Sequence, residues 1–174
     1  MKRVPTDITA FVEEQYPLLI KILETDNPPD EEKALRKVVQ KELTQLGFRT
    51  EVDETGNLLG FIGKGKDVLL LGGHLDSVMP CKGVTVVRKG TVIRSDGTTV
   101  LTADDGAGIF EVLTALRYIK KKMKKLPPID VLFTVGEEIG GKGVKHLGTA
   151  RLRARHGILL DRSAPPGTIV IAAP

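Results

Sequence analysis

Apolar residues recur at helical spacing in three segments of the chain, 6–24, 34–46 and 106–125. Pro17 should divide the first segment, because proline interrupts the interior of a helix. Gly47 stands directly after the second segment, where glycine commonly ends a helix. We therefore expect one broken helix followed by two continuous ones.

Short apolar runs bounded by turn residues predict the strands. They lie at 49–53, 58–62, 67–73, 129–135, 157–160 and 168–172, with a hairpin over 84–94 that turns at Lys89-Gly90. The runs at 129–135 and 157–160 are typical of strands covered on both faces, and the run at 67–73 should be central. Because strands alternate with helices, the pattern predicts an α/β sandwich with a mixed sheet.

The composition indicates a globular protein with neither a disulfide nor a membrane span. With 174 residues, 41% of them hydrophobic, the chain suits one globular domain, and its seven aromatic residues predict an aliphatic core. Cys81 is the only cysteine, which excludes an internal disulfide and, without a secretion signal, indicates the cytoplasm. No apolar run approaches the roughly 18 residues that a membrane span needs, so we expect no membrane association.

The net charge of +4 raises the question of a nucleic-acid partner. The densest basic segment, 120–125, lies at the end of a predicted helix, where cations complement the helix dipole. No aromatic residue interleaves with these lysines to stack on bases. We therefore expect a solvated helix end and no nucleic-acid partner.

Acidic and imidazole side chains stand at the ends of several predicted elements. They are His74 and Asp76 after 67–73, Glu137 and Glu138 after 129–135, Asp161 after 157–160, and Asp104 and Asp105 at the start of a helix. In open α/β sheets such ends converge on one crevice. Carboxylates a few ångströms apart cannot all stay ionised without a cation. The pattern predicts a divalent metal, zinc or else manganese or cobalt, in a catalytic site.

His74 and Asp76 are also spaced as a metal-binding histidine and the carboxylate that orients it. A metal-bound imidazole normally gives its second N–H to a carboxylate, which holds the ring in one direction. Asp76 is the candidate for that partner. A histidine alone is more often a satisfied core residue, so this assignment depends on the assembly of the other carboxylates.

The segment 136–143, GEEIGGKG, differs by one residue from the phosphate-loop pattern G-x-x-x-x-G-K-[ST]. Gly143 stands where that pattern requires a serine or threonine for Mg²⁺. Glu137 and Glu138 would also repel phosphate oxygens. Nucleotide binding is therefore a remote alternative, with the glycines serving as turn residues.

Four segments resemble, in order, the motifs of the di-zinc exopeptidase family. They are GGHLDSV at 72–78, LTADDGAG at 101–108, FTVGEEIGGKGVKHL at 133–147 and ILLD at 158–161. This family includes aminoacylase, acetylornithine deacetylase, succinyl-diaminopimelate desuccinylase and tripeptide aminopeptidases. The form of the Asp-Asp motif and the ending GTIVIAAP are most similar to the peptidase T-like branch of tripeptide aminopeptidases.

The resemblance implies a zinc-exopeptidase-like (phosphorylase/hydrolase) fold, a three-layer sandwich with a mostly parallel sheet and helices on both faces. It implies hydrolysis of a peptide bond in short peptides, with two zinc ions in a complete active site. The implied site residues are His74 and Asp161 at one metal, Asp104 between both metals, Glu138 at the second metal, Glu137 as general base and Asp76 orienting His74. A cis Asp104–Asp105 bond is also implied.

The resemblance further implies that residues 1–174 are the N-terminal portion of the catalytic domain. The lid or dimerisation domain and the C-terminal catalytic segment, with its further metal-binding histidine, would be absent. His146, His156 and Cys81 are expected to lie outside the site, so the second metal would keep only Asp104 and Glu138. We expect weak or no activity of this segment alone, a homodimer for the intact protein, and self-association through uncovered strand edges. The alternative is a non-catalytic metal-binding or interaction module of the same fold.

Overall fold

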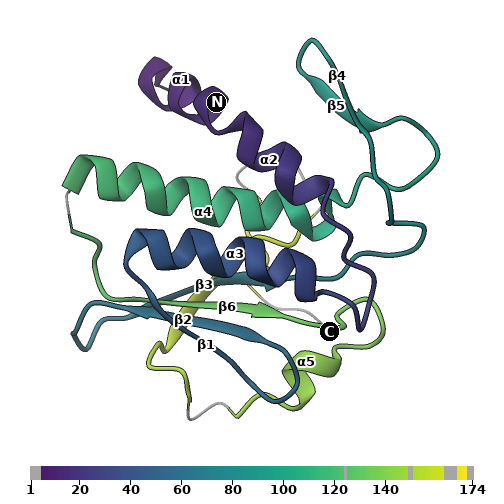
Figure 1. Cartoon of the computed structure of the whole chain (residues 1–174). Coiled ribbons are helices and arrows are strands. Elements are labelled where there is room, and N and C mark those ends of the chain that lie inside the picture. The colour runs from purple at the N-terminus through teal and green to yellow at the C-terminus, as the bar shows by residue number, and fades with distance from the viewer. Residues whose placement is uncertain (1–4, 124, 149–150, 163–167, 172–174) are drawn as a thin grey trace.

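The computed structural model describes residues 5–123, 125–148, 151–162 and 168–171 (Figure 1). The elements follow one another as α1 (Thr6–Glu14), α2 (Tyr16–Leu23), α3 (Lys33–Leu46), β1 (Arg49–Val52), β2 (Leu58–Ile62), β3 (Leu69–His74), β4 (Val86–Lys89), β5 (Val92–Ser95), α4 (Ala103–Met123), β6 (Ile129–Thr134), α5 (Lys142–Lys145) and β7 (His156–Leu159). Within the described ranges, no helix combines the length and apolarity needed to cross a membrane.

Five strands form one sheet in the order β1-β2-β6-β3-β7. β2 runs antiparallel to both of its neighbours, whereas β3 runs parallel to β6 and to β7. The mixed sheet with a mostly parallel core is therefore confirmed. The hairpin of β4 and β5 is separate and projects away from the sheet (Figure 1). Its turn is Gly90-Thr91, one residue later than predicted, because Lys89 still pairs with Val92.

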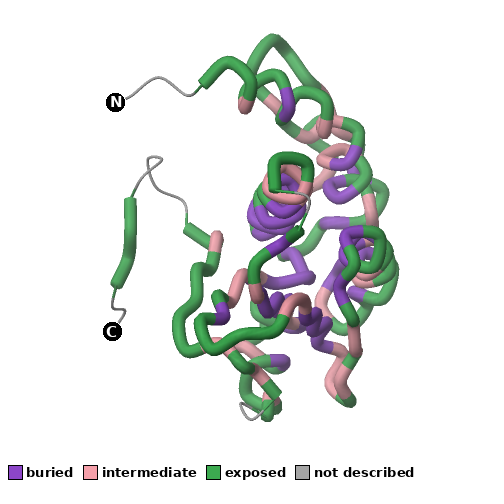
Figure 2. Tube along the Cα trace, turned by 90° about the vertical axis from the view of Figure 1, so that its left-hand side faces the viewer, coloured by how far each residue is buried: buried purple, intermediate pink, exposed green. Residues whose placement is uncertain are grey.

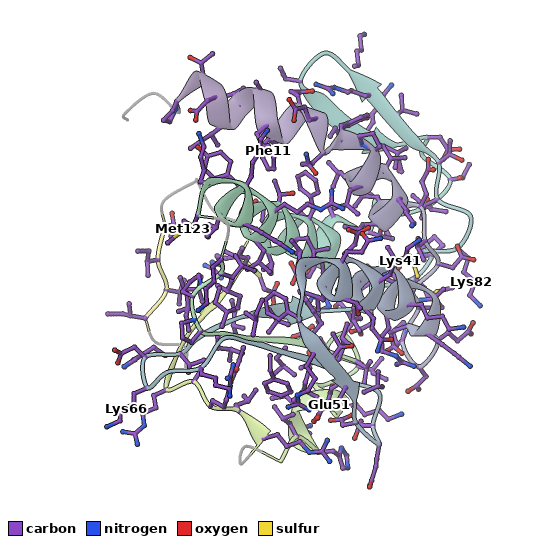
Figure 3. The ribbon with its side chains drawn as sticks, turned by 60° about the vertical axis from the view of Figure 1, so that its left-hand side comes forward. Phe11, Lys41, Glu51, Lys66, Lys82 and Met123 are labelled. Atoms are coloured by element: carbon purple, nitrogen blue, oxygen red, sulfur yellow. The ribbon has the colours of Figure 1, made fainter. Side chains whose placement is uncertain are left out.

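Helices α2, α3 and α4 lie on the same side of the sheet (Figure 1). The predicted break at Pro17 is confirmed, since α1 ends before Gln15 and α2 carries the proline in its first turn. Gly47 ends α3 in a left-handed conformation, with φ 93°. Phe11 of α1 lies against α4, with its ring centroid 5.3 Å from that of Tyr118 (Figure 3).

An aliphatic core fills the space between these helices and the sheet, as the composition predicts. Its fully buried members include Leu35, Val39 and Leu43 of α3, Ile109, Leu113 and Leu116 of α4, and Leu58, Val131 and Phe133 of the strands. Burial of one such side chain stabilises the fold by roughly 1.5–3 kcal/mol. This single core holds the start of α4 against the ends of β3 and β6.

The opposite face of the sheet has a smaller apolar cluster. It consists of Leu59, Phe61 and Leu132, with Leu147 and Leu152 packed against them. The short α5 lies on this side (Figure 1). Within the described residues, the expected third layer therefore consists of α5 and the chain that follows it.

Two predictions about the C-terminal part are wrong. Residues 168–171 form no strand, and residue 172 lies outside the described ranges; Ile169 and Ile171 are 81% and 94% exposed. Figure 2 shows this segment apart from the rest of the molecule. β7, predicted to be covered on both faces, is exposed at all four positions, and none of its residues belongs to either apolar cluster.

Candidate metal centre

Three elements deliver ligand atoms to one point at the carboxyl edge of the sheet. His74 ends β3, Asp104 stands in the first turn of α4, and Glu138 follows β6. One ligand atom of each lies within 4.8 Å of the others. The parallel register explains the meeting, because His74 is paired with Thr134 and the two strands therefore end together. Nε2 of His74 is 2.9 Å from Oδ1 of Asp104.

Asp161 lies at the rim of this group. It follows β7, the other parallel neighbour of β3, and its Oδ1 is 3.9 Å from Nε2 of His74. All four residues predicted as ligands therefore share one edge of the sheet.

The two other histidines lie elsewhere. His146 follows α5, with its Nδ1 2.9 Å from the carbonyl oxygen of Lys142, and His156 begins β7. Neither belongs to the group.

Asp76 holds the Nδ1–H group of His74, although not chiefly through its carboxylate. The nearest partner of Nδ1 is the backbone carbonyl oxygen of Asp76 at 3.0 Å, and the carboxylate oxygen Oδ1 is 3.5 Å away. Because a carbonyl oxygen only accepts hydrogen bonds, Nδ1 carries the proton. Nε2 is then directed towards Asp104. The imidazole is 2% exposed, so water does not compete for these contacts.

The carboxylate of Asp76 has a second task that the sequence pattern did not indicate. Its Oδ1 accepts the backbone N–H of Glu137 and its Oδ2 accepts that of Glu138, both at 2.9 Å. Asp76 is fully buried. Burial alone would raise the pKa of the Asp76 carboxyl, but the interactions with His74 and with the two N–H groups outweigh it and lower that pKa. Asp76 thus joins the end of β3 to the turn that carries the two glutamates.

The electrostatics of the group favour a positive charge at its centre. Burial lowers the pKa of His74, but the Asp76 hydrogen bond and the negative charges around the ring outweigh it and raise the pKa to about 10. The pKa of Glu138 is raised, first by burial and then by the charge of Asp104. The acidic side chains therefore repel one another and attract a cation.

Several supporting residues have no role in the sequence predictions. Asp105 is buried, and its Oδ2 accepts the backbone N–H of His74 at 3.1 Å. Burial raises the pKa of the Asp105 carboxyl to about 7. Ser77 donates its hydroxyl to the backbone oxygen of Asp104 at 2.7 Å, and Asn27 donates to Ser77 Oγ at 3.2 Å. Asp105 belongs to the quoted segment 101–108 and Ser77 to the quoted segment 72–78, but neither segment indicated these contacts; the Asp104–Asp105 peptide bond is cis, as the resemblance implies.

Comparison with known proteins agrees with this geometry. A model of the family described as "Peptidase family M28" matches residues 57–172, a stretch that holds every candidate ligand and covers more than half of the chain. The chain belongs to peptidase family M28. This M28 member is 31% identical to the uncharacterized protein YqjE of Bacillus subtilis over 165 residues, which is 89% of the chain and 44% of YqjE.

Peptidase T proteins are also similar to this M28 member. Peptidase T of Clostridium perfringens is 30% identical over 136 residues, which is 73% of the chain and 33% of that protein. The crystal structure of aminopeptidase PepT from Bacillus cereus superimposes with a TM-score of 0.83 at 32% identity, covering 88% of the chain and 44% of PepT. The chain therefore spans less than half the length of these relatives, and its peptidase T-like character is confirmed.

The turn 136–143 of this M28 member is unsuited to a phosphate. The N–H groups of Glu137 and Glu138 are donated to Asp76, and those of Gly140 and Gly141 to the carbonyl oxygen of Glu137. Lys142 forms an ion pair with Asp30. A phosphate loop binds through free backbone N–H groups, so the nucleotide alternative is wrong.

Two lysines near the end of α4 form hydrogen bonds or an ion pair with other residues of the chain. Lys120 donates to the carbonyl oxygens of Gln45 and Leu46 at the end of α3, and Lys122 pairs with Asp7 at 3.2 Å. Lysine near a helix C-terminus interacts favourably with the helix dipole. Lys124, another member of the basic segment, lies outside the described residues.

Proposed function

We propose that this chain is the N-terminal, metal-bearing portion of the catalytic domain of a tripeptide aminopeptidase-like exopeptidase. The observation that carries the proposal is the meeting of ligand atoms from His74, Asp104 and Glu138 within 4.8 Å. Similarity to aminopeptidase PepT and to a tripeptidase from Staphylococcus aureus supports short peptides as the substrates. We extend the proposal to a cytoplasmic protein that is a homodimer when intact.

The donor set fits a divalent metal of the first transition row. It offers one imidazole nitrogen and carboxylate oxygens, which are the ligands of zinc, manganese and cobalt sites. Burial and then the charge of Asp104 raise the pKa of Glu138, and a divalent cation would offset both effects. His74, Asp104 and Asp161 would hold one zinc ion, and Asp104 and Glu138 would serve a second, for which these residues offer fewer ligands than a closed site requires.

When bound, the two ions would polarise the scissile carbonyl and lower the pKa of a water molecule. The chain's own residues handle the proton and the geometry. Glu137, whose side chain is exposed beside Glu138, takes the proton from the attacking water and gives it to the leaving amine. Asp76 positions this general base, because its carboxylate holds the N–H groups of both glutamates.

Metal titration tests the proposal first. The full chain, dialysed against Zn²⁺ and measured by elemental analysis, should retain metal, and His74→Ala should lose it while Glu137→Ala keeps it. Absence of bound metal in the unaltered chain would contradict the proposal. Val144→Ala, an exposed position on α5 outside the ligand group, is a matched control and should bind as the unaltered chain does.

Hydrolysis of tripeptides and dipeptides then separates a peptidase from a non-catalytic module of the same fold. A longer parent protein that contains these residues should cleave the peptides, and Glu137→Ala in that protein should abolish cleavage while metal remains bound. Full activity of Glu137→Ala would refute its assignment as the base. Bound metal without cleavage in the parent would favour the non-catalytic module.

A further inference from the structure

A buried carboxylate that is not among the proposed ligands lies directly behind them. Asp105 is 3% exposed, and its Oδ2 accepts the backbone N–H of His74 at 3.1 Å. The hydrogen bond reaches the main chain of a ligand residue and not its imidazole. The Asp105 hydrogen bond therefore helps to fix the backbone position of His74 at the end of β3. The contact with Asp76 instead fixes the direction of the imidazole ring.

Two glycines make room for this carboxylate. A Cβ atom at Gly73 would lie 1.8 Å from Oδ2 of Asp105, and the three nearest atoms to it all belong to that side chain. A Cβ atom at Gly108 would lie 2.1 Å from Oδ1 of Asp105 and 2.3 Å from the backbone oxygen of Leu160. Neither glycine has a positive φ, so the need for glycine is steric.

The cradle of Gly73, Asp105 and Gly108 touches three of the four segments that carry proposed ligands. Gly73 precedes His74, Asp105 follows Asp104, and the Leu160 carbonyl against Gly108 precedes Asp161. We infer that Asp105 is a positioning residue that sets the spacing of His74, Asp104 and Asp161. This inference rests on the proposed metal centre. In the Asp-Asp motif, Asp104 would then bind metal and Asp105 would position the ligands.

The affinity of the full chain for Zn²⁺ and Co²⁺ tests the inference, with Asp105→Ala and Asp105→Asn compared. Loss of a residue that supports a metal ligand typically weakens metal binding about 10- to 100-fold, and this range is expected for Asp105→Ala. Asp105→Asn keeps an oxygen that accepts the His74 N–H and should stay within about threefold of the unaltered chain. The Co²⁺ absorption spectrum should change in Asp105→Ala only.

Asp130 provides a matched control. It is also a fully buried carboxylate that accepts backbone N–H groups, those of Arg153 and Ala154, but it lies at the start of β6, away from the ligands. Asp130→Asn should lower the melting temperature and leave the metal affinity unchanged. Unchanged affinity in Asp105→Ala, or equal losses in Asp105→Ala and Asp105→Asn, would overturn the inference. An unaltered chain that binds no metal would instead overturn the proposed function.

A double-mutant cycle tests the cradle without any metal. Gly73→Ala alone should lower the melting temperature strongly, because its methyl group meets the Asp105 carboxylate. In the Asp105→Ala background the same methyl group enters the vacated space, so Gly73→Ala should shift the melting temperature less. Contacting residues show such non-additivity. Equal shifts in the two backgrounds would show that Gly73 and Asp105 do not share this space, and would overturn the inference.

Discussion

The carboxyl edge of the sheet and its outer β7 edge differ in how their side chains are accommodated. At the carboxyl edge, His74, Asp76 and Asp105 are buried polar groups, and each has hydrogen-bond partners. At the β7 edge, Ile158 and Leu159 are apolar and are 49% and 64% exposed. The buried polar groups of the first region form their hydrogen bonds with other described residues. Among the described strands the second region pairs only with β3, so its outer edge and its apolar side chains are open to pairing with another strand.

The two regions therefore depend on different parts of the chain. The ligand group depends on residues drawn together from β3, α4 and the turn after β6, and of these His74 is buried. The β7 edge depends on pairing with β3 alone among the described strands. Substitutions at the carboxyl edge should therefore affect both stability and metal binding, whereas substitutions at β7 should affect association.

The largest effect is expected for Asp76→Ala. It removes the acceptor of two backbone N–H groups and a charged partner of His74. Leaving a buried polar group without a partner costs about 1–3 kcal/mol for each of the two N–H groups, so the free energy of unfolding should fall by about 2–6 kcal/mol. Urea denaturation followed by circular dichroism measures it. A loss below about 1 kcal/mol would show that the turn of Glu137 and Glu138 is held by other contacts.

Glu138→Gln should separate metal binding from stability. The substitution removes a ligand charge and should weaken Zn²⁺ binding by more than the roughly 10- to 100-fold expected for a supporting residue. Without added metal it should preserve or raise the melting temperature, because it removes repulsion between Glu138 and Asp104. Calorimetric titration and thermal melting check the two parts. Unaltered Zn²⁺ affinity would remove Glu138 from the ligand set.

The smallest effect on stability is expected at β7. Leu159→Lys places a charge on an exposed edge strand and should change the free energy of unfolding by less than about 0.5 kcal/mol. It should also reduce self-association, since edge charges oppose strand pairing. Size-exclusion chromatography with light scattering measures the change. A sharply monomeric unaltered chain would count against association at this edge.

Leu43→Ala is the matched control for the β7 substitution. Leu43 is fully buried in the main core. Its truncation should lower the free energy of unfolding by about 2–5 kcal/mol through lost burial and a residual cavity. A similar cost at Leu43 and Leu159 would mean that β7 is buried in solution, and the contrast between the two regions would disappear.

Much of the fold could be predicted because its elements are encoded locally. The helical spacing over 34–46 and the glycine at position 47 give both the body and the end of α3. The apolar run before Glu137 gives β6 in the same way. The strand expected at 168–172 shows the limit, since an apolar run becomes a strand only when a neighbour supplies hydrogen bonds. Residues 168–171 have no such neighbour among the described strands.

The sequence by itself determined which residue types stand at the ends of the strands, and therefore that His74, Asp104, Glu138 and Asp161 could meet. Only the tertiary structure decided how they meet. The register of β3 against β6 brings His74 level with Thr134, and the carboxylates of Asp76 and Asp105 reach backbone groups of other segments. Side-chain patterns report periodicity along a chain, whereas these hydrogen bonds depend on distances between segments far apart in it. For this reason the candidate ligands and the pairing of Asp76 with His74 follow from the sequence, whereas the contacts of Asp76 and Asp105 with backbone N–H groups do not.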